Sequence, residues 1–99
     1  MPENPLQTIM TLDPKLVEHL KATDEFIYSD GALPKKIKLL IAMAFDAADG
    51  AANGVRHLAG EALKAGATKE EIAEALRVAY NLGGVGCIYT AAQGLKDIV

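Results

Sequence analysis

The chain has 99 residues, which is enough for one hydrophobic core but not for two, so a single domain is predicted over residues 1–99. Hydrophobic residues make up 51% of the sequence and aromatic residues only 5%, a composition that favours closely packed helices rich in alanine, leucine, isoleucine and valine. The net charge of -3 offers no basic surface to nucleic acid, and the apolar stretch at residues 39–48 is too short to cross a membrane.

The first 28 residues are expected to form an N-terminal arm followed by a helix. Residues 1–10 contain two prolines and no sustained period, which is typical of an arm that is frayed or lies on a neighbouring subunit. Asp13 is a suitable N-cap residue, and Pro14 fits the first helical position because its missing N–H needs no partner there. The predicted helix ends near Tyr28, before a Ser-Asp-Gly stop.

A second helix is predicted from Pro34 to about Ala48. Its apolar residues follow the i, i+3, i+4, i+7 pattern, and a second apolar row lies on an adjoining face. A helix that is apolar around so much of its circumference is buried on more than one side. In so short a chain this pattern predicts a position at the centre of the fold or in a subunit interface, and therefore self-association.

Three further helices are predicted in the second half of the chain. The first spans about residues 51–65 and ends before Gly66, a residue type expected just past a helix C-terminus. A Thr-x-x-Glu capping-box pattern at Thr68 marks the start of the next, and the glycine pair at residues 83–84 ends it. The last begins near residue 85 or 86. No strand-period run competes with these helices, so the predicted fold class is all-α with five or six helices.

Several short segments in this order resemble a known family. They are Leu40-Ile41-Ala42, the run Ala62-Leu63-Lys64-Ala65-Gly66-Ala67-Thr68, Glu71-Ile72 and Gly83-Gly84. Over residues 33–95 the sequence resembles the carboxymuconolactone decarboxylase/AhpD-like family. The resemblance implies an AhpD-like helical bundle that assembles into a homotrimer or homohexamer, with its sites close to subunit contacts.

The resemblance also shows what this chain lacks. Thiol-active members of the family carry a Cys-x-x-Cys-x-x-x-His run on the third helix and a glutamate one helix earlier. Counting back from Gly66 places the histidine position at Leu58 and the two cysteine positions at Gly54 and Ala51, and the glutamate position falls on Leu39. None of these four side chains can perform the chemistry of its family counterpart, so dithiol peroxidase activity is not expected.

The third predicted helix supplies two candidate site residues, His57 and Arg56, and the preceding turn supplies Asp49. His57 is interpreted either as a solvated histidine beside Glu61 or as a catalytic or ligand-binding group. Asp49, like Asp46, stands near a helix C-terminus, where a carboxylate is unfavourable. It is expected either to pair with Arg56 or the next helix N-terminus, or to act as a general base while Arg56 grips a carboxylate substrate.

Cys87 is the fourth candidate. It is expected in the first turn of the last helix, where the helix dipole lowers a thiol pKa, but a lone cysteine is also commonly a small buried filler. Any functional pocket is expected at a subunit contact between the third helix and the bend at residues 83–89, where Tyr80 and Tyr89 add hydroxyl groups. The glycines of this bend follow a helix and precede no Lys-Ser/Thr, so they do not form a nucleotide loop.

Three functions are left open by the sequence. The first is cofactor-free proton transfer or decarboxylation, of lyase type, on a small anionic molecule, and the second is a non-catalytic oligomeric scaffold that binds a small molecule or protein. The third is a one-cysteine alkylhydroperoxidase-like activity through Cys87. No cofactor and no metal are expected, because neither histidine has a metal-ligand spacing. The expected partners are the chain itself and a small molecule, without nucleic acid or membrane, and the expected location is the cytoplasm.

Overall fold

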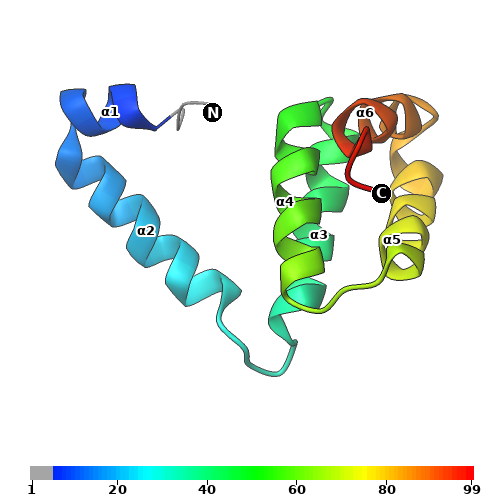
Figure 1. The fold of residues 1–99 in the computed structure, drawn as a ribbon, viewed down its shortest axis with the longest axis horizontal. Coiled ribbons are helices and arrows are strands. Elements are labelled where there is room, and N and C mark those ends of the chain that lie inside the picture. Colours follow the sequence, from blue (N-terminus) through cyan, green and yellow to red (C-terminus); the bar gives the residue numbers. More distant parts are fainter. Residues whose placement is uncertain (1–5) are drawn as a thin grey trace.

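A computed structural model describes residues 6–99 of the chain. Within them lie six α-helices and no strand, which confirms the predicted all-α class (Figure 1). The helices are α1 (Gln7–Leu12), α2 (Pro14–Tyr28), α3 (Lys35–Ala48), α4 (Ala52–Lys64), α5 (Lys69–Gly83) and α6 (Gly86–Leu95).

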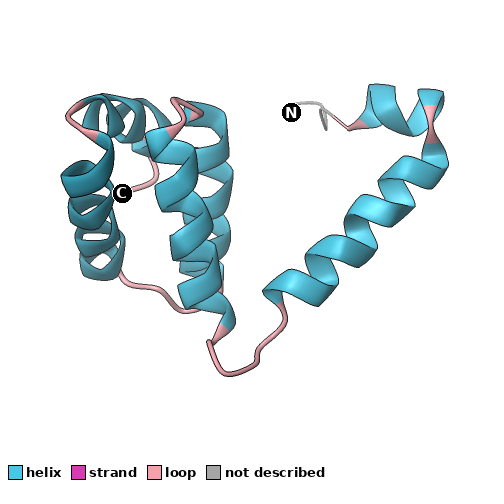
Figure 2. Ribbon diagram, turned by 180° about the vertical axis from the view of Figure 1, so that it is seen from behind, coloured by secondary structure: helices cyan, strands magenta, loops and turns pink. Residues whose placement is uncertain are grey.

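The molecule has the shape of a V, with α1 and α2 in one limb and α3–α6 in the other (Figures 1 and 2). Helix α2 approaches the larger limb only near its C-terminal end, and α1 packs against α2. The predicted N-terminal arm is therefore partly wrong, because residues 7–12 form a short helix. Residues 1–5 of that arm lie outside the described residues.

The helix boundaries follow the predicted capping residues. The Asp13 side chain accepts a hydrogen bond of 3.1 Å from the Leu16 N–H, and Pro14 occupies the first position of α2. At α5 the Glu71 N–H donates to the Thr68 hydroxyl at 3.0 Å, and the Thr68 N–H donates to the Glu71 carboxylate at 2.8 Å. This reciprocal pair is the predicted capping box, and it fixes where α5 begins.

Four helices, α3 to α6, surround a single hydrophobic core. Its most deeply buried large side chains are Met43, Val55, Ile72 and Cys87. Helix α6 crosses α4 closely, because Gly94 has no Cβ to separate them. A Cβ at that position would lie 2.5 Å from the Ala52 carbonyl oxygen. The core therefore depends on small residues as well as on large apolar ones.

Helix α3 is apolar on more than one face, as predicted. Beyond the core side, Ile41 and Phe45 are exposed in the single chain, at 45% and 68%, opposite Val78 and Leu82 of α5. These side chains line an apolar groove of about 520 Å³ between α3 and α5, the α3–α5 groove. Self-association through such a surface remains a prediction. No helix among residues 6–99 is both long enough and apolar enough to span a membrane.

Candidate functional site

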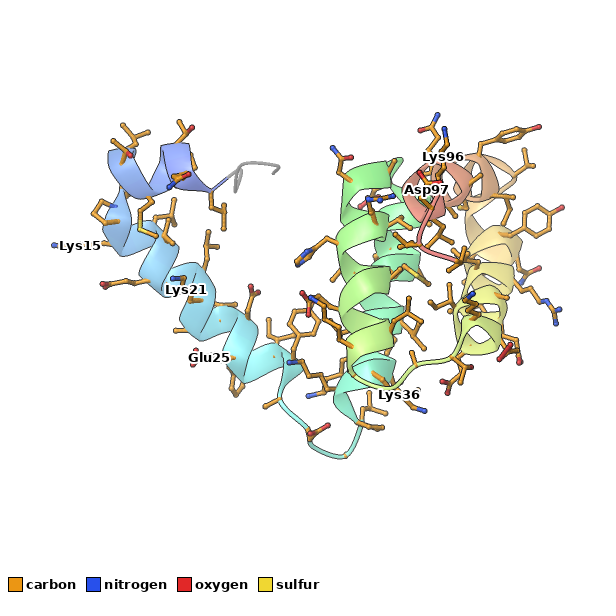
Figure 3. The ribbon with its side chains drawn as sticks, viewed as in Figure 1. Lys15, Lys21, Glu25, Lys36, Lys96 and Asp97 are labelled. Atoms are coloured by element: carbon orange, nitrogen blue, oxygen red, sulfur yellow. The ribbon has the colours of Figure 1, made fainter. Side chains whose placement is uncertain are left out.

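A pocket of about 330 Å³, lined by both charged and apolar side chains, lies where α2 approaches α3 and α4, on the opposite side of α3 from the apolar groove. Helix α2, the start and middle of α3, and the middle of α4 each contribute side chains to it. The lining residues are Asp24, Glu25, Tyr28, Lys35, Leu39, His57, Leu58 and Glu61. We call this the α2–α4 pocket. Lys15 and Lys21 lie nearer the start of α2, away from the larger limb of the V (Figure 3).

His57 is an exposed side chain at this pocket, and Glu61, one turn further along α4, lines it as well. The carboxylate of Glu61 also lies 3.8 Å from the Lys64 ammonium group. One of the two sequence-based interpretations of His57 was a solvated histidine beside Glu61, and the other was a catalytic or ligand-binding group. The pocket adds that the imidazole borders an open hollow, where it could come within hydrogen-bond reach of a bound molecule, as a proton-transferring group must.

Two apolar residues form the inner wall of the pocket. Leu39 is buried and Leu58 is half-buried, and both line the pocket although they come from different helices. They are the positions that the family resemblance assigns to a glutamate and a histidine. Two of the positions that the resemblance assigns to the family site therefore line one pocket in this fold, and both carry leucine.

Tyr28 is a pocket residue that the sequence did not single out. Burial raises the pKa of its phenol above the ordinary value of 10.0, and the nearby negative charges of Asp24 and Asp46 raise this pKa further. The phenol therefore keeps its proton at neutral pH and is a hydrogen-bond donor. Asp24 and Tyr28 are four residues apart on one helix face, but nothing in the sequence indicated which helices that face would meet.

Arg56 serves a different part of the molecule. Its guanidinium group donates hydrogen bonds to the carbonyl oxygens of Gly94, at 3.3 Å, and Lys96, at 2.5 Å. Lys96 and Asp97 follow the end of α6 (Figure 3). Arg56 thus holds the last helix against α4 and is absent from the α2–α4 pocket.

Asp49 is the C-cap residue of α3 and is exposed. Two ion pairs occur among residues 6–99, Lys36–Glu71 at 3.0 Å and Lys64–Glu61. The ion pair that we considered between Arg56 and Asp49 or Asp46 therefore does not form. Asp49 is also absent from the α2–α4 pocket, so the structure does not bring it together with His57.

Cys87 lies in the first turn of α6, as expected, but is only 2% exposed. Its thiol contacts the Ala79 carbonyl oxygen at 3.5 Å. A Cβ on Gly83 would lie 2.6 Å from the sulfur, so the absence of a side chain there makes room for the thiol. Tyr80 and Tyr89 are exposed, and the α2–α4 pocket includes neither them nor Cys87. The four candidate residues do not form one cluster within the chain.

Comparison with known proteins identifies the family. The family model described as the carboxymuconolactone decarboxylase family matches residues 14–97, most of the chain. This chain belongs to the carboxymuconolactone decarboxylase family. Its fold is similar to the apo crystal structure of a carboxymuconolactone decarboxylase family protein from Legionella pneumophila, with a TM-score of 0.85 and 32% identity. The similarity covers 92% of this chain and 81% of the Legionella chain. No curated protein matches the chain.

Family membership confirms the resemblance drawn from the short sequence segments. As a carboxymuconolactone decarboxylase family protein, the chain carries the family fold. Among residues 6–99, no group of three or more histidine, cysteine, aspartate or glutamate residues is arranged to hold a metal ion.

Proposed function

We propose that this carboxymuconolactone decarboxylase family protein catalyses proton transfer on a small molecule without a cofactor, in the α2–α4 pocket and in the cytoplasm. The observation that carries the proposal is the position of His57, at a pocket whose wall is made by Leu39 and Leu58. A neutral imidazole is a suitable general base near pH 7. It stands beside the place where the family site is expected.

The pocket supplies the other requirement of such a reaction. When the His57 imidazole takes a proton from a carbon next to a carbonyl group, the C–H electron pair moves toward the carbonyl oxygen. The Tyr28 phenol, which stays protonated, can donate a hydrogen bond to that oxygen as its charge grows. The imidazolium then returns the proton to another carbon of the same molecule, so the net reaction moves one proton and shifts a double bond.

The charges of the pocket favour an uncharged substrate over the anionic one expected from the sequence. Asp24, Glu25 and Glu61 place carboxylates around the pocket, whereas Lys35 is its single lysine. Arg56, the group expected to grip a carboxylate substrate, is engaged at the end of α6. Small ketones and lactones therefore suit the site better than carboxylates, since like charges repel across a short distance.

The experiment follows the isomerisation of α-angelica lactone to β-angelica lactone by ¹H NMR, a proton shift on an uncharged five-membered ring. We expect the wild type to accelerate the shift and His57→Gln to abolish the acceleration. The matched control is His19→Gln, because His19 is exposed on α2 and does not line the pocket. A wild-type rate equal to the buffer rate, or full activity in His57→Gln, would count against the proposal.

A one-cysteine peroxidase activity is less well supported. The Cys87 thiol is buried against Ala79, so a hydroperoxide cannot reach it without local opening of α6.

The second candidate function is a non-catalytic oligomeric scaffold, and the α3–α5 groove is the observation that favours it. Exposed Phe45 and Leu82 offer apolar surface there to another chain. A homotrimer or homohexamer is compatible with either function.

A further inference from the structure

Helix α2 carries a row of apolar side chains that stays exposed in the single chain. Leu16, Leu20 and Ile27 recur at intervals of four and seven residues, so they lie on one face of the helix. Each of the three is between 38% and 47% exposed. Among the residues of α2, all of which the structure describes, only Val17 is buried. We call Leu16, Leu20 and Ile27 the α2 stripe.

The α3–α5 groove has the length and the lining to receive such a stripe. Ile37, Ile41 and Phe45 of α3 follow one another along it at intervals of four residues, and Ala48 lies beyond them. Ala48 is eleven residues after Ile37, a distance of about 16–17 Å along a helix, and the α2 stripe has the same length. An amphipathic helix with the apolar face of α2 therefore fits this groove.

The helix that fills the groove cannot be the α2 of the same chain. Residues 29–34 join α2 directly to α3, and there α2 approaches the side of α3 that carries Leu39. The groove lies on the opposite side of α3. The bend between the two helices is held by the Lys38 ammonium group, which donates to the Ser29 carbonyl oxygen at 2.7 Å. The α2 helix of a second copy has no such restriction.

The V shape determines the direction in which this second α2 would run. Helices α2 and α3 diverge from an apex formed by residues 29–34 (Figures 1 and 2). If a two-fold axis passes near the apexes of two copies, α2 of each copy extends from there beside α3 of the other. Because α2 ends at the apex and α3 begins there, the two helices are antiparallel.

This direction is favourable for the helix dipoles. Helix α5 runs parallel to α3, because Lys36 pairs with Glu71 at 3.0 Å near their starts, and a Cβ on Gly83 would lie 3.4 Å from the Ala48 Cβ at their ends. The negative ends of both helix dipoles therefore lie where the partner α2 begins with its positive end.

The charged side chains are complementary in the same direction. Lys15 lies in the first turn of α2, and Asp49 is the C-cap residue of α3. Asp24 and Glu25 lie near the end of α2, while α3 opens with two lysines at residues 35–36. An antiparallel pair brings lysine toward carboxylate at both ends, whereas a parallel pair would bring like charges together.

The exposed apolar surface is sufficient for a stable pair when both copies contribute a stripe and a groove. Complete burial of a large apolar side chain removes roughly 100 Å² from water, and those that take part are between 38% and 83% exposed. They are Leu16, Leu20, Ile27, Ile41, Phe45, Val78 and Leu82. One stripe in one groove thus buries about 400 Å² of apolar surface, or about 700 Å² with its polar rim. Two such contacts exceed the minimum of about 1,000–1,200 Å² for a specific interface.

We propose that two copies of this chain exchange their N-terminal limbs, so that the α2 stripe of each copy occupies the α3–α5 groove of the other. The partner of the groove is therefore a second copy of the chain, and the partnering element is α2. A homohexamer would contain three such pairs. The proposal is independent of the chemistry in the α2–α4 pocket, which lies on the other side of α3.

The first experiment removes one half of the contact at a time. Leu20→Asp places a charge in the α2 stripe and leaves the groove intact, whereas Phe45→Asp blocks the groove and leaves the stripe intact. Both variants should have a lower mass than the wild type by light scattering. Ala22→Asp is the matched control, because Ala22 is exposed on α2 about 200° around the helix from Leu20, and it should keep the wild-type mass.

The second experiment recombines the intact halves. The ¹⁵N-labelled Phe45→Asp chain, which keeps its stripe, is titrated with unlabelled Leu20→Asp chain, which keeps its groove. We expect saturable shifts of the backbone amide signals of residues 14–28, because one of the two contacts can form again. Titration with unlabelled Phe45→Asp chain should leave these signals in place, since no intact groove is present.

Several results would overturn the proposal. A monomeric wild type would do so, as would a wild-type mass in Leu20→Asp, which a direct groove-to-groove pairing predicts. Loss of assembly in Ala22→Asp would show that the stripe is not the face involved. An absence of shifts when the two complementary variants are mixed would also contradict it, and circular dichroism of each variant shows that both chains are folded.

Discussion

Replacing Gly94 by alanine should destabilise the protein, although alanine is the better helix former. The added Cβ would lie 2.5 Å from the Ala52 carbonyl oxygen and 2.9 Å from the Val55 Cβ, and the first of these atoms belongs to backbone. Overpacking of this kind costs about 1–3 kcal/mol, while helix propensity returns at most about 1 kcal/mol. Because backbone is harder to displace than a flexible side chain, we expect a net loss of about 1–2 kcal/mol.

Gly60 provides the matched control. It lies within α4, and a Cβ built there meets no atom within 4 Å. Gly60→Ala should therefore stabilise the chain by about 0.5–1 kcal/mol, because only the conformational entropy of glycine changes. Urea unfolding followed by circular dichroism at one fixed protomer concentration gives both free-energy changes. Equal stabilisation by Gly94→Ala and Gly60→Ala would refute the reasoning that the close crossing of α4 and α6 leaves no room for a side chain at Gly94.

Three further predictions concern the α5 cap, pH and assembly. Thr68→Ala should lower the free energy of unfolding by about 1 kcal/mol, because the capping box is lost, whereas Thr8→Ala on exposed α1 should change it little in the same urea assay. The hydrogen bond that the Thr68 backbone N–H donates to the Glu71 carboxylate, and then the hydrogen bond from Lys36, hold the pKa of Glu71 below its ordinary value of 4.5. The stabilisation from Glu71 is therefore present at neutral pH and is lost as the pH falls below about 4.5 and through the lower folded-state pKa, so Glu71→Gln should flatten the acid limb of a pH–stability curve. Light scattering should show a trimer or hexamer for the wild type. Phe45→Asp places a charge in the α3–α5 groove and should shift the assembly toward smaller species. A monodisperse wild-type monomer would contradict this prediction.

The elements that the sequence predicted well are those with a local physical signature. Asp13 and Pro14 mark the start of α2, and Thr68 marks the start of α5, because a cap is determined by residues within one turn of each other. The helix breaks near residues 50, 66 and 84 were foreseen for the same reason, since each contains a glycine with a positive φ angle. Only α1 was missed, because a helix of six residues shows less than two turns of any period.

The candidate site was predicted less completely, because it depends on which helix faces meet. His57 was recognised as a polar residue beside Glu61. The contribution of α2 to the pocket, however, follows from the angle between α2 and α3, which residues 29–34 connect. That angle is stabilised by the Lys38 ammonium group, which donates to the Ser29 carbonyl oxygen at 2.7 Å, and by the Lys35 N–H, which donates to the Asp30 carboxylate at 2.7 Å. No periodicity in the sequence reports such a bend.

Arg56 illustrates why residue type alone gave the wrong partner. An arginine one turn inside α4, close in sequence to two aspartates, suggested an ion pair across the α3–α4 turn. In the fold, its guanidinium group instead donates to carbonyl oxygens at the end of α6, about 40 residues further on. Those carbonyl groups have no partner within their helix, because the last four of any helix lack one. The packing of α6 on α4 brings these unpaired carbonyl groups within reach of the Arg56 guanidinium group. Because Gly94 permits that packing, it affects both the stability of the fold and the position of the Arg56 side chain.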